Sequence, residues 1–480
     1  MTDPASRAEG DAVNLVVDLA PLSALDTWGA NLTPASRRLI DESRVAIGSS
    51  GVFTAGTGHQ PGFFHAGILA KFIAADSIAS ARGAVSNWIH FISDADTHDP
   101  LRIDLPLRSS DGGVRRGSVS LARPERVSPH APACIRAVGR AIDEGPEREA
   151  LGAAVASERG EKVLTAVLDA CAQSAEHAPD AAMQVARACE SMMSAWVRPS
   201  AAIVPTRTLL ATPMGRWAVD AILSRPAECA RAFNEALALE PHSARFLRES
   251  GDASEVPLWG VAADGTRLRL NAVGARRALA AGELVLPRAF LASGLMRLVV
   301  DLFVHGTGGA HYERAGDRWW RECLGIELPP FAVVSASLFP SPAALGIPMR
   351  LDASVGVRFR EAWWNPALLT DNPASAAHSA ERAELLRCIA DAPRRSPERR
   401  AAYCSLLESI SRGRASATEQ LDSLKSHESH HACALKESAL LADRTWPFLL
   451  LDPSAIDGLV GAIRARVHST GATSAKGSGR

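Results

Sequence analysis

The chain has 480 residues, of which 47% are hydrophobic and 22% charged, and its formal net charge is -1. This is enough apolar material for one large or two ordinary globular cores. The near-neutral balance argues against nucleic acid as a partner, because phosphate binding needs a basic excess or stripe. No signal-peptide pattern opens the chain, and no run reaches the about 20 apolar residues that span a bilayer. We therefore expect a cytoplasmic protein with small-molecule or protein partners, and no membrane contact.

The eight cysteines are scattered along the chain, with no CxxC pair and no dense spacing of the secreted kind. Cytosolic proteins rarely hold disulfides, because their thiols are kept reduced. We expect reduced, mostly structural thiols.

The first part of the chain predicts alternating strands and helices after a disordered tail at residues 1–11. The expected elements are a short strand or extended segment in 13–21, a helix in 32–44 behind a Thr-Pro start signal, a strand in 52–57, a helix in 63–83 and a strand in 86–93. Residues 52–99 have the length of a βαβ unit, for which parallel pairing is the natural topology.

The remainder predicts a second alternating part and a helical extension. We expect hairpins in 101–123 and 259–274, and between them an Ala-rich helical region in 133–250 that a loop or short strand interrupts at 203–215. A strand is expected in 331–340. A charged helical hairpin or coiled coil follows in 376–444, with breaks at 392–400 and 411–416, then a return to the core in 445–466 and a disordered tail in 467–480. The fold class is α/β with a parallel-sheet core, formed by 12–132 and 251–375, and a C-terminal helical arm.

The stretch TGHQPGFFHAG, residues 57–67, joins the strand in 52–57 to the following helix. Gly58 and Gly67 let a ligand approach the backbone, and the helix start offers free N–H groups to an anion. His59, Gln60 and His65 add hydrogen-bonding or proton-transfer groups where α/β sheets place their ligands. The alternative is a tight turn in which one histidine caps the helix.

Lys71 follows His65 by six residues, which is almost two helical turns. The two side chains therefore do not share a face, and we expect Lys71 to face solvent.

The segment DADTHD carries Asp94, Asp96, His98 and Asp99 just beyond the strand in 86–93. Carboxylates beside an imidazole suit a general base oriented by an acid, or a hard-metal site. We favour proton transfer or binding of a substrate amine over a metal. The alternative is a polar, well-capped loop.

A glycine-rich loop is predicted in VHGTGGAHYER, residues 304–314, which contains Gly306, Gly308, Gly309 and His311. Such a loop can cradle phosphate through its amides, although the pattern is neither GxGxxG nor the GK[ST] loop of nucleotide hydrolases. A further cluster, His427, His430 and His431, shares one helical face and could bind zinc, but we favour a solvated helix surface.

The ordered series of TGHQPGFFHAGILAKF, NWIHFISDADTHD, AADGTRLRLN, the long segment 285–314, FAVVSASLFP and a helical arm resembles the bacillithiol biosynthesis cysteine-adding enzyme family. The resemblance covers roughly residues 50–460. It implies a Rossmann-like core, a helical connecting region, and a coiled-coil arm that forms a homodimer. It also implies an amide-forming reaction between cysteine and the amine of glucosaminyl malate. We assign no cofactor with certainty, and ATP or ADP is the possible nucleotide. No metal is assigned.

The resemblance assigns roles to residues of the three polar segments and to Arg288, which lies in a matching segment before the glycine-rich loop. The expected catalytic residues are His59, His65, Asp96, His98 and Asp99. The expected binding residues are Gly58, Gln60, Gly67, Asp94, Arg288, Gly306, Gly308, Gly309 and His311. The chain departs from the family in having His59 where glutamine is typical, and in having Thr97 between the acid and the histidine of DADTHD.

Three functions follow as hypotheses. The first is an amide-forming ligase in which His59 or His65 stabilises charge and the Asp96, His98 and Asp99 group takes a proton from the attacking amine. The second is a dimeric nucleotide- or sugar-phosphate-binding protein without chemistry. The third is a hydrolase with zinc or manganese bound at DADTHD.

Overall fold

The structure is a computed structural model of the chain. It describes residues 14–19, 28–30, 32–49, 53–122, 128–139, 142, 146–241, 244–348, 359–369 and 375–475, so the predicted tail at 1–11 lies outside it. The chain forms two compact units. Unit 1 comprises 1–108, 116–346 and 443–480, and unit 2 comprises 109–115 and 347–442.

A six-stranded sheet forms the centre of unit 1, in the order β1-β11-β10-β2-β3-β6. Its strands are β1 Asn14–Asp18, β2 Thr54–His59, β3 Asn87–Ile92, β6 Ala202–Pro205, β10 Leu302–His305 and β11 Phe331–Ser337. All neighbouring pairs are parallel except β1, which runs antiparallel to β11 at the edge. The α/β class with a mostly parallel sheet is thereby confirmed.

The predicted βαβ unit is present as β2, α2 Ala66–Arg82 and β3. His65 caps the start of α2, and Gly83, at a φ of 131°, follows its end. Alternation along β3 sends its side chains to opposite faces of the sheet. His90 contacts Phe72 of α2, at 4.9 Å between ring centroids, whereas Phe91 contacts Phe303 on the other face, at 5.9 Å.

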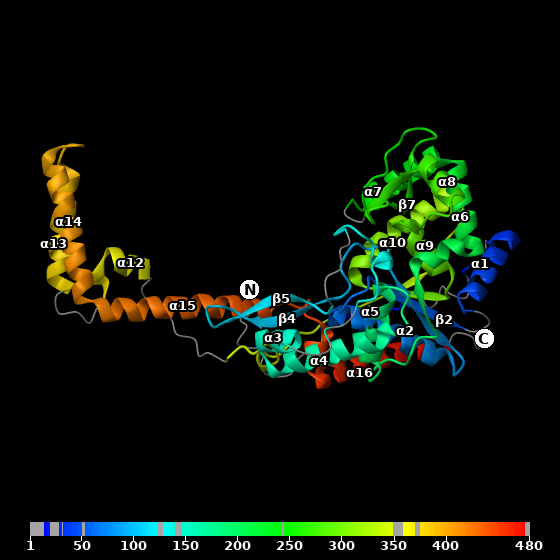
Figure 1. Ribbon diagram of the computed structural model, residues 1–480, viewed down its shortest axis with the longest axis horizontal. Coiled ribbons are helices and arrows are strands. Elements are labelled where there is room, and N and C mark those ends of the chain that lie inside the picture. The colour runs from blue at the N-terminus through cyan, green and yellow to red at the C-terminus, as the bar shows by residue number, and fades with distance from the viewer. Residues whose placement is uncertain are drawn as a thin grey trace. The chain divides into compact units, whose positions relative to one another are not determined.

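Helix α2 is buried around its whole circumference, from Ala66 to Ala79. One side packs on β2 and β11, and α16, Pro453–Ala475, covers it from outside (Figure 1). The prediction that Lys71 faces solvent is therefore wrong, and its residue is only 5% exposed. The prediction of a disordered tail at 467–480 is also wrong in part, because α16 continues through 467–475.

The other face of the sheet is covered by α6 Pro213–Ser224, α7 Pro226–Leu239, α9 Phe290–Leu298 and α10 Thr307–Trp319. Their core includes Phe233, Phe290 and Trp319, packed with Phe91 and Phe303 of the sheet. A three-stranded antiparallel sheet flanks these helices, formed by β8 Arg267–Asn271, β7 Glu255–Val261 and β9 Val285–Pro287. Its β7–β8 pair confirms the hairpin predicted in 259–274.

A disulfide joins Cys229 of α7 to Cys323, in the π-helical turn Trp320–Leu324 after α10. The expectation that all cysteines are reduced is therefore wrong. The packing of α7 against this turn brings the two Cα atoms to 5.2 Å, although 94 residues separate them in sequence. No spacing motif could reveal such a pair.

The remaining elements of unit 1 include several that were predicted. The predicted ones are α1 Pro34–Ala46, the pair of strands β4 Arg102–Arg108 and β5 Val114–Ser120, and the connecting helices α3 Pro146–Ala154, α4 Glu158–Ala175 and α5 Ala181–Met193; the first two residues of β5 belong to unit 2. Two further helices, α8 Ala272–Ala280 and α11 Pro342–Leu345, were not predicted. Thr33 caps α1 through its side chain, as its Thr-Pro signal predicts. The predicted interruption at 203–215 holds β6, which joins the edge of the main sheet.

Unit 2 is helical, with α12 Phe359–Trp364, α13 Ser375–Asp391, α14 Pro397–Ser416 and α15 Thr418–Leu441. Arg412 binds Glu381 at 2.6 Å and Arg399 donates to the Ile389 carbonyl oxygen at 2.7 Å, a register that makes α13 and α14 antiparallel. The predicted break at 392–400 is confirmed for 392–396, whereas α14 already begins at Pro397. The predicted break at 411–416 is wrong because α14 continues to Ser416. His427, His430 and His431 lie in α15, but their side chains are outside the described residues.

No helix in the described ranges is both long enough and apolar enough to cross a membrane.

Candidate functional site

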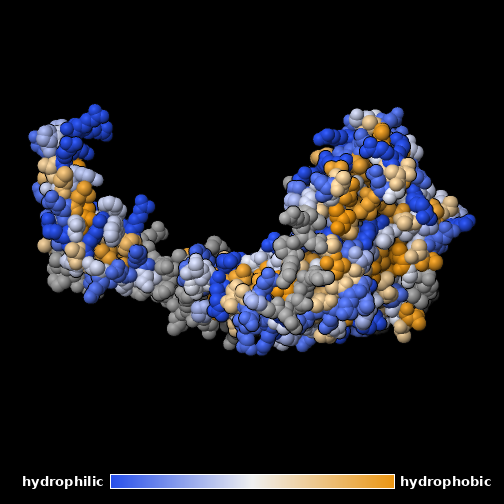
Figure 2. Space-filling view, in the orientation of Figure 1, coloured by the Kyte–Doolittle hydropathy of each residue, from blue (hydrophilic) through white to orange (hydrophobic). Residues whose placement is uncertain are grey.

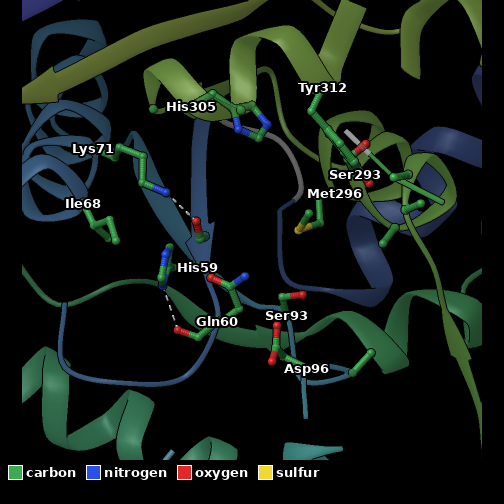
Figure 3. A pocket seen from close by; sticks show the side chains of 18 of the residues that line it. His59, Gln60, Ile68, Lys71, Ser93, Asp96, Ser293, Met296, His305 and Tyr312 are labelled. Atoms are coloured by element: carbon green, nitrogen blue, oxygen red, sulfur yellow. Dashed lines mark hydrogen bonds between the residues drawn. The ribbon is translucent and has the colours of Figure 1, made fainter. Parts of the chain in front are cut away.

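A cavity of about 810 Å³ lies at the carboxyl ends of the parallel strands in unit 1 (Figure 3). The neighbouring strands β2 and β10 are followed by connections that run in opposite directions along the sheet, from β2 to β3 and from β10 to β11. Open α/β sheets bind ligands in the crevice at such a switch point. The cavity therefore occupies the position at which the fold class predicts a ligand.

Ten of the residues predicted for the site line this one cavity. They are Gly58, His59, Gln60, His65, Gly67, Asp96, Arg288, Gly306, Gly308 and Gly309. The first turn, the acidic strand end and the glycine-rich segment are thus brought together, although they are up to 250 residues apart in sequence. Their roles in binding or catalysis stay predictions.

Asp94 does not line the cavity. Its side chain is fully buried, 2.6 Å from Arg207 and 2.8 Å from the Thr206 hydroxyl, which donates to it. Burial raises the pKa of Asp94, and the Arg207 guanidinium opposes that shift. Arg207 also binds Asp180, the N-cap of α5, so Asp94 belongs to a network that joins β3 to the connecting helices.

In the described residues, no side chain-to-side chain hydrogen bond joins Asp96, His98 and Asp99, the group predicted to take a proton from the amine. Asp96 accepts a hydrogen bond from the backbone N–H of His98 at 2.8 Å, and Asp99 accepts one from Leu101 at 3.1 Å. Both carboxylates therefore cap their own turn, as the alternative interpretation of this loop had it. Only Asp96 lines the cavity. Across the described ranges, no group of three histidine, cysteine or acidic residues is arranged to hold a metal ion.

His311 also lies outside the cavity. Its side chain is 63% exposed and 3.5 Å from Glu240, which Arg314 binds as well. It occupies the second turn of α10. The predicted glycine-rich loop is itself wrong as a loop, because Gly306 is the N-cap and Thr307, Gly308 and Gly309 form the first turn of α10.

His59 presents a hydrogen-bond acceptor. Its Nδ1 lies 3.0 Å from the Gln60 carbonyl oxygen, so Nδ1 carries the proton and Nε2 is left as the acceptor (Figure 3). Burial, with Lys71 nearby, lowers the pKa of His59 to about 3. His59 is therefore neutral at physiological pH.

His65 is a neutral donor of the opposite tautomer. Its Nδ1 accepts the backbone N–H of Gly67 at 3.0 Å, so the proton is carried by Nε2. Burial lowers the pKa of His65, and the positive charges of Arg444 and Lys71 add to the effect. His65 thus caps α2 and also lines the cavity.

Lys71 is a member of the cavity lining that the sequence did not identify. Its ammonium group donates a 2.6 Å hydrogen bond to the carbonyl oxygen of Gly58, at the end of β2. Burial lowers its pKa to about 8. The sequence holds a partial signal, because Lys71 interrupts the otherwise apolar run 66–75, but that run does not show which elements cover the helix.

His305, at the end of β10, also lines the cavity; it belongs to the predicted glycine-rich segment but was not among the expected site residues. Its Nε2 lies 3.0 Å from a carboxylate oxygen of fully buried Glu313, whose other oxygen is 2.8 Å from Arg297. Burial opposes ionisation of Glu313, but His305 and Arg297 outweigh it and lower the pKa of the carboxyl to about 2. The ionised Glu313 thus places a negative charge beside His305.

Most charged groups in the described lining are basic. Lys71, Arg245, Arg267, Arg288 and Arg444 line the cavity, against one carboxylate, Asp96. Arg267 and Arg288 both lie over the ring of Trp259, at 4.2 and 4.6 Å from its centroid. Such an excess favours anionic ligands.

A second chamber of about 400 Å³ adjoins the first. Both chambers are lined by His59, Gln60, His65, Ile68 and Asp96. The second chamber also has a mixed set of charges, His98, Arg102, Asp104 and Arg116. The shared residues thus stand between two spaces, each large enough for a small molecule.

No family model matches the chain, and no curated protein matches it significantly.

Proposed function

We propose that this protein is an amide-forming ligase that joins cysteine to the amine of an acidic substrate such as glucosaminyl malate. One observation carries the proposal. The three polar segments meet at one cavity, whose described lining is mostly basic and has one carboxylate, Asp96. Basic side chains suit the carboxylates of such a substrate, and Asp96 suits its ammonium group. The order of segments, which resembles the bacillithiol biosynthesis cysteine-adding enzyme family, supports this choice of substrates.

In the reaction the amine nitrogen attacks the activated carboxyl carbon of cysteine. The new C–N bond replaces a C–O bond whose oxygen leaves with the activating phosphate group, and the ammonium nitrogen loses two protons in all. In this proposal Asp96 takes one proton of the ammonium group. His65 donates its Nε2 proton toward the carboxyl oxygen that gains negative charge. His59 accepts a hydrogen bond from the amine through Nε2 and so orients it.

The two chambers support a reaction with two substrates. Asp96, His59 and His65 line both spaces, so a group held in one chamber can meet a group held in the other. We place the acidic amine in the larger, basic chamber and the smaller cysteine in the second chamber. Holding both partners in reach contributes to the rate by removing the need for a chance encounter.

Condensation needs an activated carboxyl group, and we propose ATP as its source. The start of α10 fits a phosphate group, because Gly306 brings no capping side chain and the helix N-terminus is positive. Lys71 lies beside this turn and adds positive charge.

A homodimer formed through the helical arm of unit 2 is part of the proposal. The paired helices α13 and α14 leave Leu386, Tyr403 and Leu407 between 38% and 53% exposed. Figure 2 shows hydrophobic residues gathered along this helix pair. Contiguous apolar surface of this kind favours a partner, here a second copy of the chain. Light scattering on the protein and on Leu407→Glu tests this, with a dimer and a monomer expected.

A binding protein without ligase activity is the second candidate. The excess of basic groups in the described lining favours it, as do the carboxylates of Asp96 and Asp99, which accept backbone N–H groups of their own turn. It would bind a nucleotide or sugar phosphate in the larger chamber and form no product.

The test is to incubate the purified protein with isotopically labelled cysteine, ATP and either glucosaminyl malate or a pool of cellular metabolites, and to follow masses by mass spectrometry. A new labelled product, heavier than its acceptor by cysteine minus water, supports the ligase. Saturable retention of one metabolite with no labelled product supports the binding protein instead.

A further inference from the structure

Lys71 and His305 approach the same turn of the chain from two elements. A Cβ atom placed on Gly306 would lie 3.7 Å from Cδ of Lys71, and one placed on Gly309 would collide with Nδ1 of His305. The two side chains therefore border the first turn of α10 on both sides. Figure 3 shows both of them entering the cavity, Lys71 from α2 and His305 from the end of β10.

The backbone of this turn has donors to offer. Gly309 and Ala310 donate their N–H groups to the carbonyl oxygen of Gly306, as the first bonds of the helix. In the ranges that the structure describes, the N–H groups of Thr307 and Gly308 have no acceptor, and Gly306 has no side chain to cap them. The first N–H groups of a helix need such an acceptor.

Lys71 supplies an independent reason to expect an anion. Its side chain is nearly completely buried, yet only one of the three donors of its ammonium group is bound within the described residues, to the Gly58 carbonyl oxygen. A buried cation is costly unless a counter-charge meets it. The carboxylate of Glu313, which lies 3.0 Å from His305, is already bound by Arg297.

We propose that Lys71, His305 and the first turn of α10 form a single oxyanion subsite, which takes one phosphate or carboxylate group of a ligand in the cavity. Lys71 supplies the charge, Thr307 and Gly308 supply N–H donors, and a ring nitrogen of His305 completes the set. The inference rests on the proposed function in one respect only, that the anion belongs to a substrate of that reaction.

The test measures binding of inorganic phosphate and of malate to the full-length protein by calorimetry, without turnover. Lys71→Met removes the charge and keeps the length of the side chain, and Lys71→Arg keeps the charge. Lys162→Met is the matched control, because Lys162 is 72% exposed and pairs only with Glu158 on the surface of α4. We expect Lys71→Met to weaken binding about 10- to 100-fold, as for a lost hydrogen bond to a charged group. We expect Lys71→Arg to stay within about threefold and Lys162→Met to leave binding unchanged.

A second pair of variants tests the backbone donors and does not depend on Lys71. Thr307→Pro removes one N–H group at the first helical position, where proline is well tolerated, and Gly306 already has the extended backbone that precedes proline. Thr307→Ala removes the same hydroxyl but keeps the N–H group. The subsite predicts weaker phosphate or malate binding in Thr307→Pro than in Thr307→Ala, by about fivefold or more.

The preferred probe identifies the ligand group, since a subsite for phosphate loses phosphate binding and one for carboxylate loses malate binding. Unchanged affinity for both probes in Lys71→Met and in Thr307→Pro would overturn the subsite. Loss of anion binding without any labelled amide in the ligase assay keeps the subsite and rejects the ligase. Amide formation at an unchanged rate in both variants keeps the ligase and rejects the subsite.

Discussion

The ammonium group of Lys71 donates a 2.6 Å hydrogen bond to the carbonyl oxygen of Gly58, where β2 ends at the cavity. This bond ties the central helix α2 to the strand that carries His59. Strands of the sheet and α16 pack against α2, and its buried lysine lines the cavity. The packing of α2 in the core thus places a positively charged side chain in the cavity.

The first prediction concerns stability at alkaline pH. Burial lowers the pKa of Lys71 in the folded protein to about 8, below its ordinary value of 10.5. Between these values the unfolded chain binds more protons, so the free energy of unfolding should rise with pH relative to Lys71→Met. His59 and His65 stay neutral throughout this range because their pKa values are lowered. Urea unfolding at pH 7.5 and 10 should show a relative gain of about 2 kcal/mol. Parallel pH profiles for the two proteins would contradict the assignment.

The second prediction concerns the buried pair beneath His305. Glu313→Gln removes the charge that meets Arg297 and His305, so we expect a loss of about 3–5 kcal/mol in the free energy of unfolding. Asp317→Asn is the matched control, because Asp317 binds the same guanidinium at 2.7 Å but its side chain is 38% exposed. It should cost less than about 1 kcal/mol. Equal losses in chemical denaturation would show that burial does not decide the effect.

The third prediction uses the close approach of α2 to β11. A Cβ atom on Gly67 would lie 2.9 Å from the carbonyl oxygen of Ala336, a contact that the packed backbone cannot relieve cheaply. Gly67→Ala should therefore destabilise the protein by about 1–3 kcal/mol. Gly461→Ala, in α16, meets nothing within 4 Å and should stabilise by about 0.5–1 kcal/mol. Thermal unfolding of both variants checks the opposite signs.

The fourth prediction concerns the bond between Cys229 and Cys323. Denatured protein, alkylated without reductant, should carry two fewer labels than protein reduced first. Peptide mapping should place both missing labels at these two positions. Full alkylation without reductant would mean that the thiols are unpaired in the purified protein.

Much of the fold was predictable because its signals are local. Apolar runs such as NWIHFI, the Thr33 cap and the terminal Gly83 fix elements from a few neighbouring residues. The edge strand β6 and the antiparallel β1 were harder, since their place in the sheet depends on partners far along the chain.

The site residues, too, were predictable where their signals are local and not where distant parts of the chain decide their surroundings. Small residues at strand ends indicated where the cavity lies, so Gly58, His59 and Gly306 were found. Lys71 was missed because its environment is set by α16, almost 400 residues later in sequence. Asp94 and Asp99 were taken for site residues because a sequence cannot show that Arg207 and a backbone N–H group already bind them.

Turnover of labelled cysteine by Asp96→Asn and Asp99→Asn, beside the unaltered protein, tests the proposed ligase most directly. The two substitutions are chemically identical and three residues apart, but only Asp96 lines the cavity. The account predicts that the unaltered protein forms the labelled amide, that Asp96→Asn lowers the rate about 100-fold or more, and that Asp99→Asn stays within about threefold. A labelled product formed equally well by Asp96→Asn, or no product from the unaltered protein, would contradict it.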